Sequence, residues 1–202
     1  MNICYIVGAG DFPYPFTPDK SDLVIAADGG YDSLMRHGIR CDLLIGDLDS
    51  IEGAPSGVEL LRFPVKKDET DSFLAYYEGK GRGYTEFHIY GGTGGRADHT
   101  VANISLLLHA REDGCRAFLF GSHNISTVIK NEAKCFDGAP EKHFSAFAIG
   151  GAAEGVTIKG LEYECESVTL TESFPLAVSN RFVGKTAEIK VEHGALLIML
   201  ER

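Results

Sequence analysis

Up to about residue 120 the chain contains short, largely apolar runs, and each run is followed by glycine or aspartate. These runs cover residues 3–7, 23–27, 42–45, 87–90 and 115–120. Unbroken apolar runs, unlike alternating ones, are typical of strands that are covered on both faces. The pattern therefore predicts the strands of a buried, mostly parallel sheet.

Two segments between these runs have helical patterns. Thr70 or Asp71 can cap a helix that continues to about Glu78, with Gly79 and Gly81 as its stop. Residues 98–111 repeat apolar side chains at helical spacing. Strands that alternate with helices favour a parallel sheet with helices on both faces, and ligands of such sheets bind beyond the carboxyl ends of the strands.

The pattern changes after about Ser122, where helical periodicity is absent. Short, alternating runs separated by glycines occupy residues 126–130, 143–149, 155–158, 167–170, 187–191 and 196–200. Such runs are typical of an all-β sandwich. We therefore predict a protein of the α/β class with two domains. An N-terminal, mostly parallel Rossmann-like α/β domain (residues 1–124) is followed by a C-terminal all-β sandwich (jelly-roll-like) domain (residues 125–202).

Charge and cysteine content narrow the possible partners and location. The net charge of −10 argues against nucleic acid as the main partner, because duplex binding needs clustered Lys and Arg. The five cysteines show no Cys-x-x-Cys spacing, so they predict neither a disulfide framework nor a zinc site. There is no signal-peptide pattern and no membrane-length apolar run, which makes the cytoplasm the expected location.

Acidic residues follow several of the predicted strands, and they point to a metal. Asp47 and Asp49 are two residues apart, so in an extended segment both carboxylates face the same way and can reach one Mg²⁺. Asp71 can complete this metal site while Thr70 caps the next helix. Lys67 is a candidate phosphate contact. The competing interpretations are an ordinary turn, a helix cap and a solvated lysine.

A glycine-rich turn, residues 91–95, lies between a strand and a helix. Glycines there allow backbone N–H groups to approach phosphate oxygens, and Arg96 can pair with a phosphate through two hydrogen bonds. Asp98 begins the helix, where a simple N-cap is the alternative. His99 can orient that carboxylate or pack structurally, and Asn103 lies one turn further on the same helix face.

Two further polar motifs have weaker signals. Asp28 and Gly29 end the second strand, where glycine allows the close approach of a nucleotide or of the next helix. Ser179 and Asn180 follow an apolar stretch in the second domain and, taken alone, predict a hairpin turn.

The order of these motifs resembles the thiamin pyrophosphokinase family. The sequence reads Asp-Gly-Gly, Gly-Asp-Leu-Asp-Ser, Lys-Asp-Glu-Thr-Asp, Gly-Gly-Thr-Gly-Gly-Arg-Ala-Asp-His and, late in the chain, Ser-Asn-Arg-Phe. The resemblance covers nearly the whole chain. It implies a homodimer that transfers pyrophosphate from ATP to thiamine, with Mg²⁺ as cofactor, and gives thiamine diphosphate and AMP.

The resemblance also implies roles for single residues. Asp47, Asp49 and Asp71 would surround Mg²⁺ and the ATP phosphates, and Asp98 would lie near the metal and the thiamine alcohol. Nucleotide contacts are expected from Asp28, Gly29, Lys67, Gly92, Gly95, Arg96 and His99. Ser179 and Asn180 would help to bind thiamine, reaching the active site of the partner subunit. Asp71, Asp98 and Arg96 are the expected catalytic residues.

Three rival functions stay open on sequence alone. The first is a Mg-dependent nucleotide pyrophosphohydrolase that uses water in place of thiamine. The second is a non-catalytic sensor of ATP or thiamine with a degenerate site. The third is a pyrophosphokinase acting on a sugar nucleotide or a pterin. The chain would bind neither nucleic acid nor a membrane under any of these readings.

Overall fold

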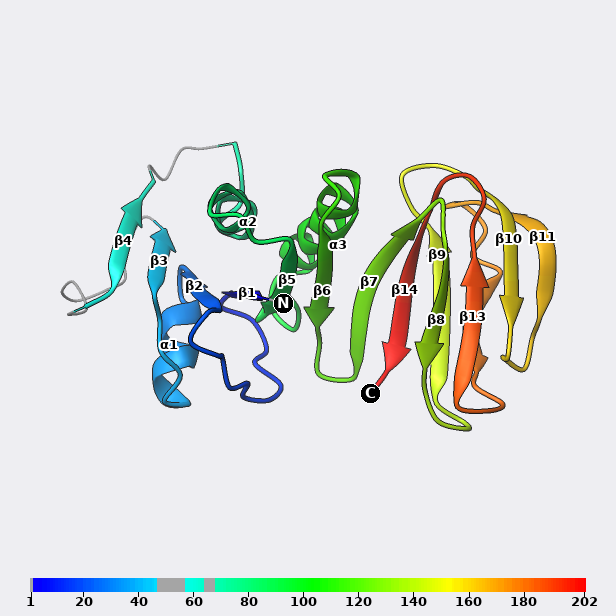
Figure 1. The fold of residues 1–202 in the computed structure, drawn as a ribbon, viewed down its shortest axis with the longest axis horizontal. Coiled ribbons are helices and arrows are strands. Elements are labelled where there is room, and N and C mark those ends of the chain that lie inside the picture. The colour runs from blue at the N-terminus through cyan, green and yellow to red at the C-terminus, as the bar shows by residue number, and fades with distance from the viewer. Residues whose placement is uncertain (1, 47–56, 64–67) are drawn as a thin grey trace. The chain divides into compact units, whose positions relative to one another are not determined.

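The computed structural model describes residues 2–46, 57–63 and 68–202 (Figure 1). The chain divides into two compact units, and each is described here by itself. Unit 1 comprises Met1–Leu106 and Gly114–Ser122, and unit 2 comprises Leu107–Asp113 and His123–Arg202. The fold is a mixed α/β fold with extensive sheet and few helices in the described residues.

Unit 1 is built on parallel strands in the order β6-β5-β1-β2-β3-β4. Their bounds are β1 (Cys4–Val7), β2 (Leu23–Ala27), β3 (Leu43–Gly46), β4 (Glu59–Arg62), β5 (Glu86–Tyr90) and β6 (Arg116–Phe120). Strands β1, β2 and β3 are buried at every position, as their unbroken apolar runs predict. The short strand β4 was not predicted, because only its central residues are even partly buried.

The described residues of unit 1 also form helices α1 (Gly30–Arg36) and α2 (Asp71–Gly81) and the N-terminal part of α3 (Ala97–Glu112), whose remainder belongs to unit 2. The Thr70 hydroxyl caps α2 by accepting a hydrogen bond from the Phe73 N–H at 3.4 Å. Helix α2 continues past Gly79 and ends at Gly81, one of the two glycines predicted as its stop. A side chain at Gly79 would lie 2.7 Å from the Cys4 sulfur, so this glycine serves the close packing of α2 on β1.

Helices α1 and α2 pack on opposite faces of the sheet. Leu34 of α1 packs in one core cluster with Tyr5 and Val7 of β1. Cys4 points to the opposite face because side chains alternate along a strand, and there it meets Gly79 of α2. Helix α1 has only seven residues, too few to give the helical repeat that sequence analysis needs.

Unit 2 contains two antiparallel sets of strands, in the orders β12-β9-β14-β7 and β11-β10-β13-β8. Their bounds are β7 (Asn124–Lys130), β8 (Ala133–Asp137), β9 (His143–Ala148), β10 (Ala153–Lys159), β11 (Cys165–Leu170), β12 (Ala177–Arg181), β13 (Thr186–Lys190) and β14 (Ala195–Glu201). One core, which includes Phe144, Ile158 and Ile198, joins both sets.

One local expectation in unit 2 was wrong. Ser179 and Asn180 lie within strand β12, where a hairpin turn was predicted. The polar sequence hid the strand because four of its five positions are at least partly exposed, and its register with β9 shifts between Ala177 and Asn180.

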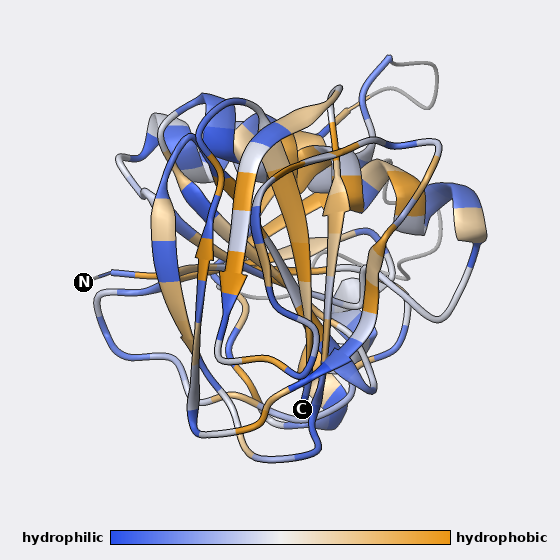
Figure 2. Cartoon of the chain, turned by 90° about the vertical axis from the view of Figure 1, so that its right-hand side faces the viewer, coloured by the Kyte–Doolittle hydropathy of each residue, from blue (hydrophilic) through white to orange (hydrophobic). Residues whose placement is uncertain are grey.

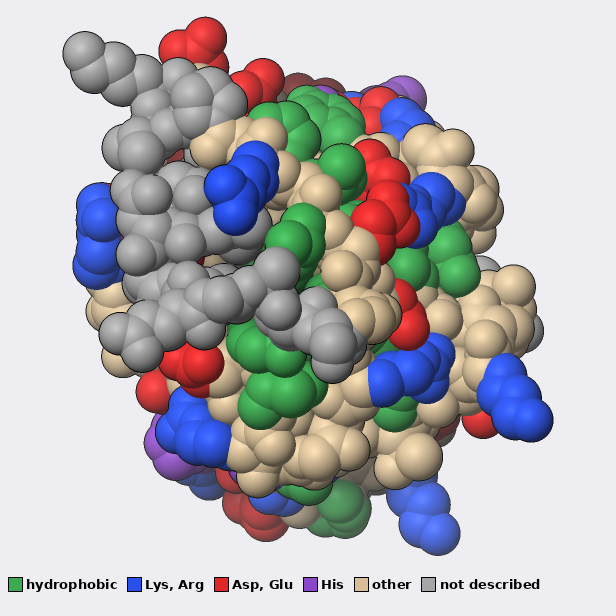
Figure 3. Space-filling model, turned by 90° about the vertical axis from the view of Figure 1, so that its left-hand side faces the viewer, with side chains coloured by type: hydrophobic (Ala, Val, Ile, Leu, Met, Phe, Trp, Pro, Cys, Tyr) green, Lys and Arg blue, Asp and Glu red, His purple; other side chains and the backbone are tan. Residues whose placement is uncertain are grey.

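The hydropathy of the residues differs between the strands and the loops that connect them (Figure 2). Hydrophobic residues concentrate on the strands, whereas the connecting loops are mostly hydrophilic (Figure 2). Acidic and basic side chains are interspersed with apolar ones on the face shown in Figure 3. Among the described helices, none combines the length and apolar character that a membrane crossing requires.

Candidate active site

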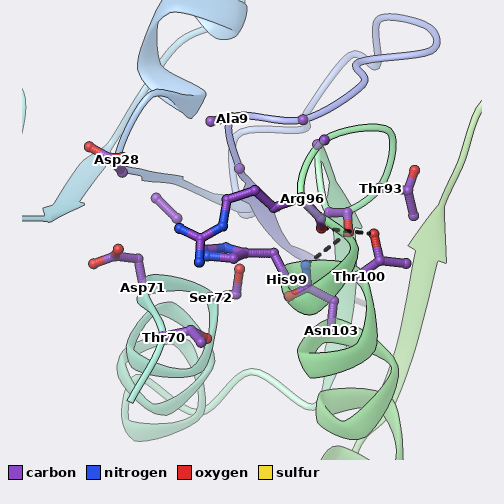
Figure 4. Close-up of a pocket in the computed structure, with 16 residues that line it drawn as sticks. Ala9, Asp28, Thr70, Asp71, Ser72, Thr93, Arg96, His99, Thr100 and Asn103 are labelled. Atoms are coloured by element: carbon purple, nitrogen blue, oxygen red, sulfur yellow. Dashed lines mark hydrogen bonds between the residues drawn. The ribbon is translucent and has the colours of Figure 1, made fainter. Parts of the chain in front are cut away.

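A cavity of about 280 Å³ lies within unit 1, beyond the carboxyl ends of its central strands. Residues 8–10 after β1, residues 27–28 at the end of β2 and the loop after β5 form part of its lining. Residues 70–72 and the first turns of α3 complete it (Figure 4). This is the position where open α/β sheets bind their ligands, as the sequence predicted.

Two glycine-containing loops meet at this cavity through their backbones. The N–H of Gly10 donates to the Gly91 carbonyl at 2.8 Å, and the N–H of Asp11 donates to the Thr93 carbonyl at 2.7 Å. In return, the Gly91 N–H donates to the Asp11 carbonyl at 3.1 Å. A side chain at Gly91 would clash with the Gly8 carbonyl at 2.1 Å, and its φ of +65° also favours glycine. The loops are therefore locked together in one conformation.

Two of the predicted carboxylates, Asp28 and Asp71, line the cavity and lie toward the same side of it in Figure 4. Asp71 is the first residue of α2. Asp28 has a φ of +49°, a left-handed conformation that is uncommon outside glycine and is concentrated at functional sites. Its N–H donates to the Ile45 carbonyl at 2.8 Å, which fixes this conformation. Gly29 does not line the cavity; it packs toward Ala9.

Arg96 and Asp98 form an exposed ion pair at the N-terminal end of α3. The Arg96 Nη2 lies 2.6 Å from Asp98 Oδ2, and its Nε lies 3.1 Å from Oδ1. These hydrogen bonds hold the pKa of the Asp98 carboxyl below its ordinary value. The same carboxylate accepts the His99 N–H at 3.0 Å. Arg96 lines the cavity, so it can exchange Asp98 for a phosphate group.

His99 and Asn103 both line the cavity, and they share one face of α3 as the helical spacing predicted. Asn103 is only 4% exposed, and its amide donates to the Gly92 carbonyl at 3.0 Å. This bond ties the first turns of α3 to the glycine loop, residues 91–95. Gly92 and Gly95 both line the cavity. Asn103 thus holds the loop, while His99 is exposed at the rim.

Sequence reasoning missed several lining residues and one supporting residue. Ala9, Thr93 and Thr100 line the cavity, but small or hydroxyl side chains in loops give no distinct signal. Asp11 lies behind the glycine loop: its carboxylate accepts from the Ser122 hydroxyl at 2.9 Å. A side chain at Gly94 would overlap the Asp11 carboxylate, which shows how closely the two segments pack.

Some predicted residues lie elsewhere. Asp47, Asp49 and Lys67 fall outside the described residues. Within the described ranges, no group of three or more His, Cys, Asp or Glu residues is placed to hold a metal ion. Ser179 and Asn180 belong to unit 2, which contains no part of the lining described above.

A parallel sheet with glycine loops, two carboxylates and an arginine at one cavity defines the class of α/β proteins that bind phosphate compounds. Comparison with known families is more specific. The thiamin pyrophosphokinase catalytic domain matches residues 17–119, and the vitamin B1 binding domain of the same enzymes matches residues 126–196. The chain belongs to the thiamin pyrophosphokinase family.

Individual relatives agree with this assignment. The thiamine pyrophosphokinase of Bacillus subtilis (strain 168) is 26% identical over 191 residues, which covers 90% of this chain and 88% of that protein. The crystal structure of the Bacillus subtilis enzyme matches the fold with a TM-score of 0.87 at 23% identity, covering 100% and 99% of the two chains. An Enterococcus faecalis family member matches with a TM-score of 0.85 at 22% identity and the same coverage.

Proposed function

We propose that this chain transfers the pyrophosphoryl group of ATP to the hydroxyl of thiamine, giving thiamine diphosphate and AMP. The observation that carries the proposal is the cavity beyond the carboxyl ends of the unit 1 strands, where glycine loops, Asp28, Asp71 and Arg96 converge. Residues 1–124 would form a Rossmann-like catalytic domain that binds ATP. Residues 125–202 would form a sandwich domain that binds thiamine.

Mg²⁺ is the cofactor that this donor set fits. Asp28 and Asp71 supply hard carboxylate oxygens to the cavity, which suit Mg²⁺ together with substrate phosphates. Asp71 would hold the ion with Asp47 and Asp49, the residues between β3 and β4. When bound, Mg²⁺ would offset the negative charge that the phosphates develop during transfer.

The residues of the cavity would bind and orient the triphosphate. Backbone N–H groups of the glycine loop and the N-terminus of α3 favour phosphate oxygens. Arg96 would leave Asp98 and pair with a phosphate, while Gly92, Gly95, Lys67 and His99 make further nucleotide contacts. Asp28 and Gly29, at the end of β2, would contact the rest of the nucleotide.

Proton transfer can be coupled to this exchange. The thiamine hydroxyl oxygen attacks the β-phosphorus, the bond from that phosphorus to the oxygen of the α-phosphate breaks, and AMP leaves. The hydroxyl proton passes to a carboxylate. Asp98 is a poor acceptor while Arg96 lowers its pKa, but it becomes a better one once Arg96 turns to the phosphate. Asp71 is the alternative acceptor.

A direct assay tests the proposed function. Purified protein with ATP, Mg²⁺ and thiamine should form thiamine diphosphate and AMP in equal amounts, and omission of Mg²⁺ should stop both. AMP release without thiamine would instead identify a pyrophosphohydrolase. Calorimetric binding of ATP without any turnover would identify a sensor.

We also propose that the chain works as a homodimer in the cytoplasm. Unit 2 exposes large apolar side chains within one stretch of sequence, namely Tyr163, Phe174, Leu176, Val178 and Val183. Exposed apolar groups of this kind mark interaction surfaces. All five cysteines are free thiols, which suits a reducing compartment. Light scattering coupled to gel filtration should give twice the 21.9 kDa chain mass, and a monomer at micromolar concentration would contradict the dimer.

A further inference from the structure

Asn180 is a buried polar residue on the otherwise exposed strand β12. Its side chain is only 3% exposed, whereas Ser179 and Arg181 beside it are exposed. Strand β12 pairs with β9 at one edge of its sheet. Burying an amide at such an edge costs free energy unless its polar atoms form hydrogen bonds. The hydrogen-bond partners of Asn180 therefore indicate its role.

The amide of Asn180 is occupied by backbone groups. Its Oδ1 accepts from the Tyr163 N–H and from the Arg181 N–H, each at 2.9 Å. Its Nδ2 donates to the Tyr163 carbonyl at 2.7 Å. Both acceptor positions of the oxygen and one of the two donors are therefore used. A substrate contact would require these short bonds to break.

These bonds join two segments that lie far apart in the sequence. The Glu162 N–H donates to the Arg181 carbonyl at 2.9 Å, and Leu161 forms a bridge with Phe182. Asn180 extends this pairing by one residue, because its side-chain amide presents a donor and an acceptor to Tyr163 as a backbone strand would. The Tyr163 side chain is left 67% exposed on this fixed backbone.

Ser179 is held in an unusual conformation on the other side of Asn180. Its φ is +58°, and it lies where the register between β12 and β9 shifts. Its N–H donates to the Ser145 hydroxyl at 3.1 Å. Irregularities of this kind redirect a side chain away from the regular strand pattern. Asn180 anchors the strand directly after this point.

We propose that Asn180 is a positioning residue for thiamine recognition, one that fixes the backbones of Tyr163 and Ser179 and does not itself contact thiamine. This inference rests on the proposed function and assigns the two adjacent polar residues different tasks. Ser179 is exposed and would meet the substrate, whereas the side chain of Asn180 is buried against the protein.

Asn180→Asp tests the proposal with little change in shape. The carboxylate keeps the acceptor but loses the donor to the Tyr163 carbonyl, and a negatively charged oxygen then faces that carbonyl oxygen. We expect the KM for thiamine to rise by at least about tenfold, since small misplacements in a site have effects of this size, while the KM for ATP stays within about twofold. Equal changes in both KM values, or no change in either, would overturn the proposal.

Asn131→Asp is the control for this substitution at an exposed position. Asn131 lies in the same unit and only accepts a bond, from the Gly194 N–H at 2.8 Å, so an aspartate keeps that bond. Both KM values should match those of the unchanged protein. If Asn180→Asp does not fold, Ser145→Ala replaces it: loss of the hydroxyl behind Ser179 should raise the KM for thiamine in the same selective way, and an unchanged KM would overturn the proposal.

Amide hydrogen exchange separates positioning from direct contact. In the unchanged protein, the Tyr163 and Arg181 amides should be protected, and saturating thiamine should leave that protection intact or increase it. Faster exchange of both amides on adding thiamine would mean that Asn180 turns toward the substrate, which overturns the proposal. This measurement reads the bonds of Asn180 whether or not the turnover assay succeeds, so failure of the proposed function is recognised separately, by absence of thiamine diphosphate.

Discussion

Replacing Asp71 with asparagine is expected to lower the rate of thiamine diphosphate formation by about 10³-fold, equivalent to about 4 kcal/mol of activation free energy. Asparagine has nearly the same shape but lacks the negative charge that we assign to Mg²⁺ binding. The fold should survive, because Thr70 still caps α2. The lost charge at the helix N-terminus costs less than about 1 kcal/mol of stability. Steady-state rates and thermal unfolding measure the two effects separately.

Asp32→Asn provides the control for this experiment. Asp32 lies in the first turn of α1, as Asp71 lies in the first turn of α2, but it does not line the cavity. The same loss of charge there should leave the rate within about twofold, with a stability change of similar size. If Asp71→Asn kept full activity, or if both variants lost activity equally, the assignment of Asp71 to the metal would be wrong.

The central sheet could be predicted from sequence because strands that are buried on both faces have a recognisable apolar pattern. Strands β1 and β2 need apolar side chains at every position, so each appears as an unbroken run. Strand β12 and helix α1 have no such pattern. β12 is a partly exposed edge strand with a register shift, and α1 is shorter than three full turns. Local pattern is least informative where tertiary contacts decide the conformation.

The candidate site divides in the same way. Asp28 and the glycine loop could be predicted because strand ends converge in a parallel sheet. Asp71 is not at a strand end; it begins α2 and was predicted from its motif. The Arg96–Asp98 pair could not be predicted, since two residues predicted to bind different groups bind each other. Nor could Asp11, because its partners Thr93 and Ser122 are distant in sequence.

Asn180 illustrates a different limit. Its motif pointed to a polar residue with a functional role, but the sequence does not say whether the amide faces the substrate or the protein. Three hydrogen bonds and 3% exposure point to the protein. A residue can thus mark a binding site in the sequence while acting only through its neighbours.

Gly10→Ala is expected to disrupt the nucleotide site from within. The added methyl group would lie 2.2 Å from the Thr93 carbonyl and 2.7 Å from the Gly91 carbonyl, and neither backbone oxygen can rotate away. The two loops must separate, which breaks the bonds from Gly10 and Asp11 at about 1 kcal/mol each. We expect a lower melting temperature and at least about a tenfold weaker affinity for ATP, measured by calorimetry.

Gly95→Ala separates loop geometry from phosphate contact. Gly95 lines the same cavity, but apart from its two chain neighbours no atom of the described residues lies within 4 Å of the position that its methyl group would take. The melting temperature should therefore stay unchanged. If a phosphate lies against Gly95, the methyl group will occupy its space and weaken ATP binding without any loss of stability. Normal ATP affinity in Gly95→Ala would place the phosphates elsewhere in the cavity, and normal affinity in Gly10→Ala would show that the paired loops do not form the nucleotide site.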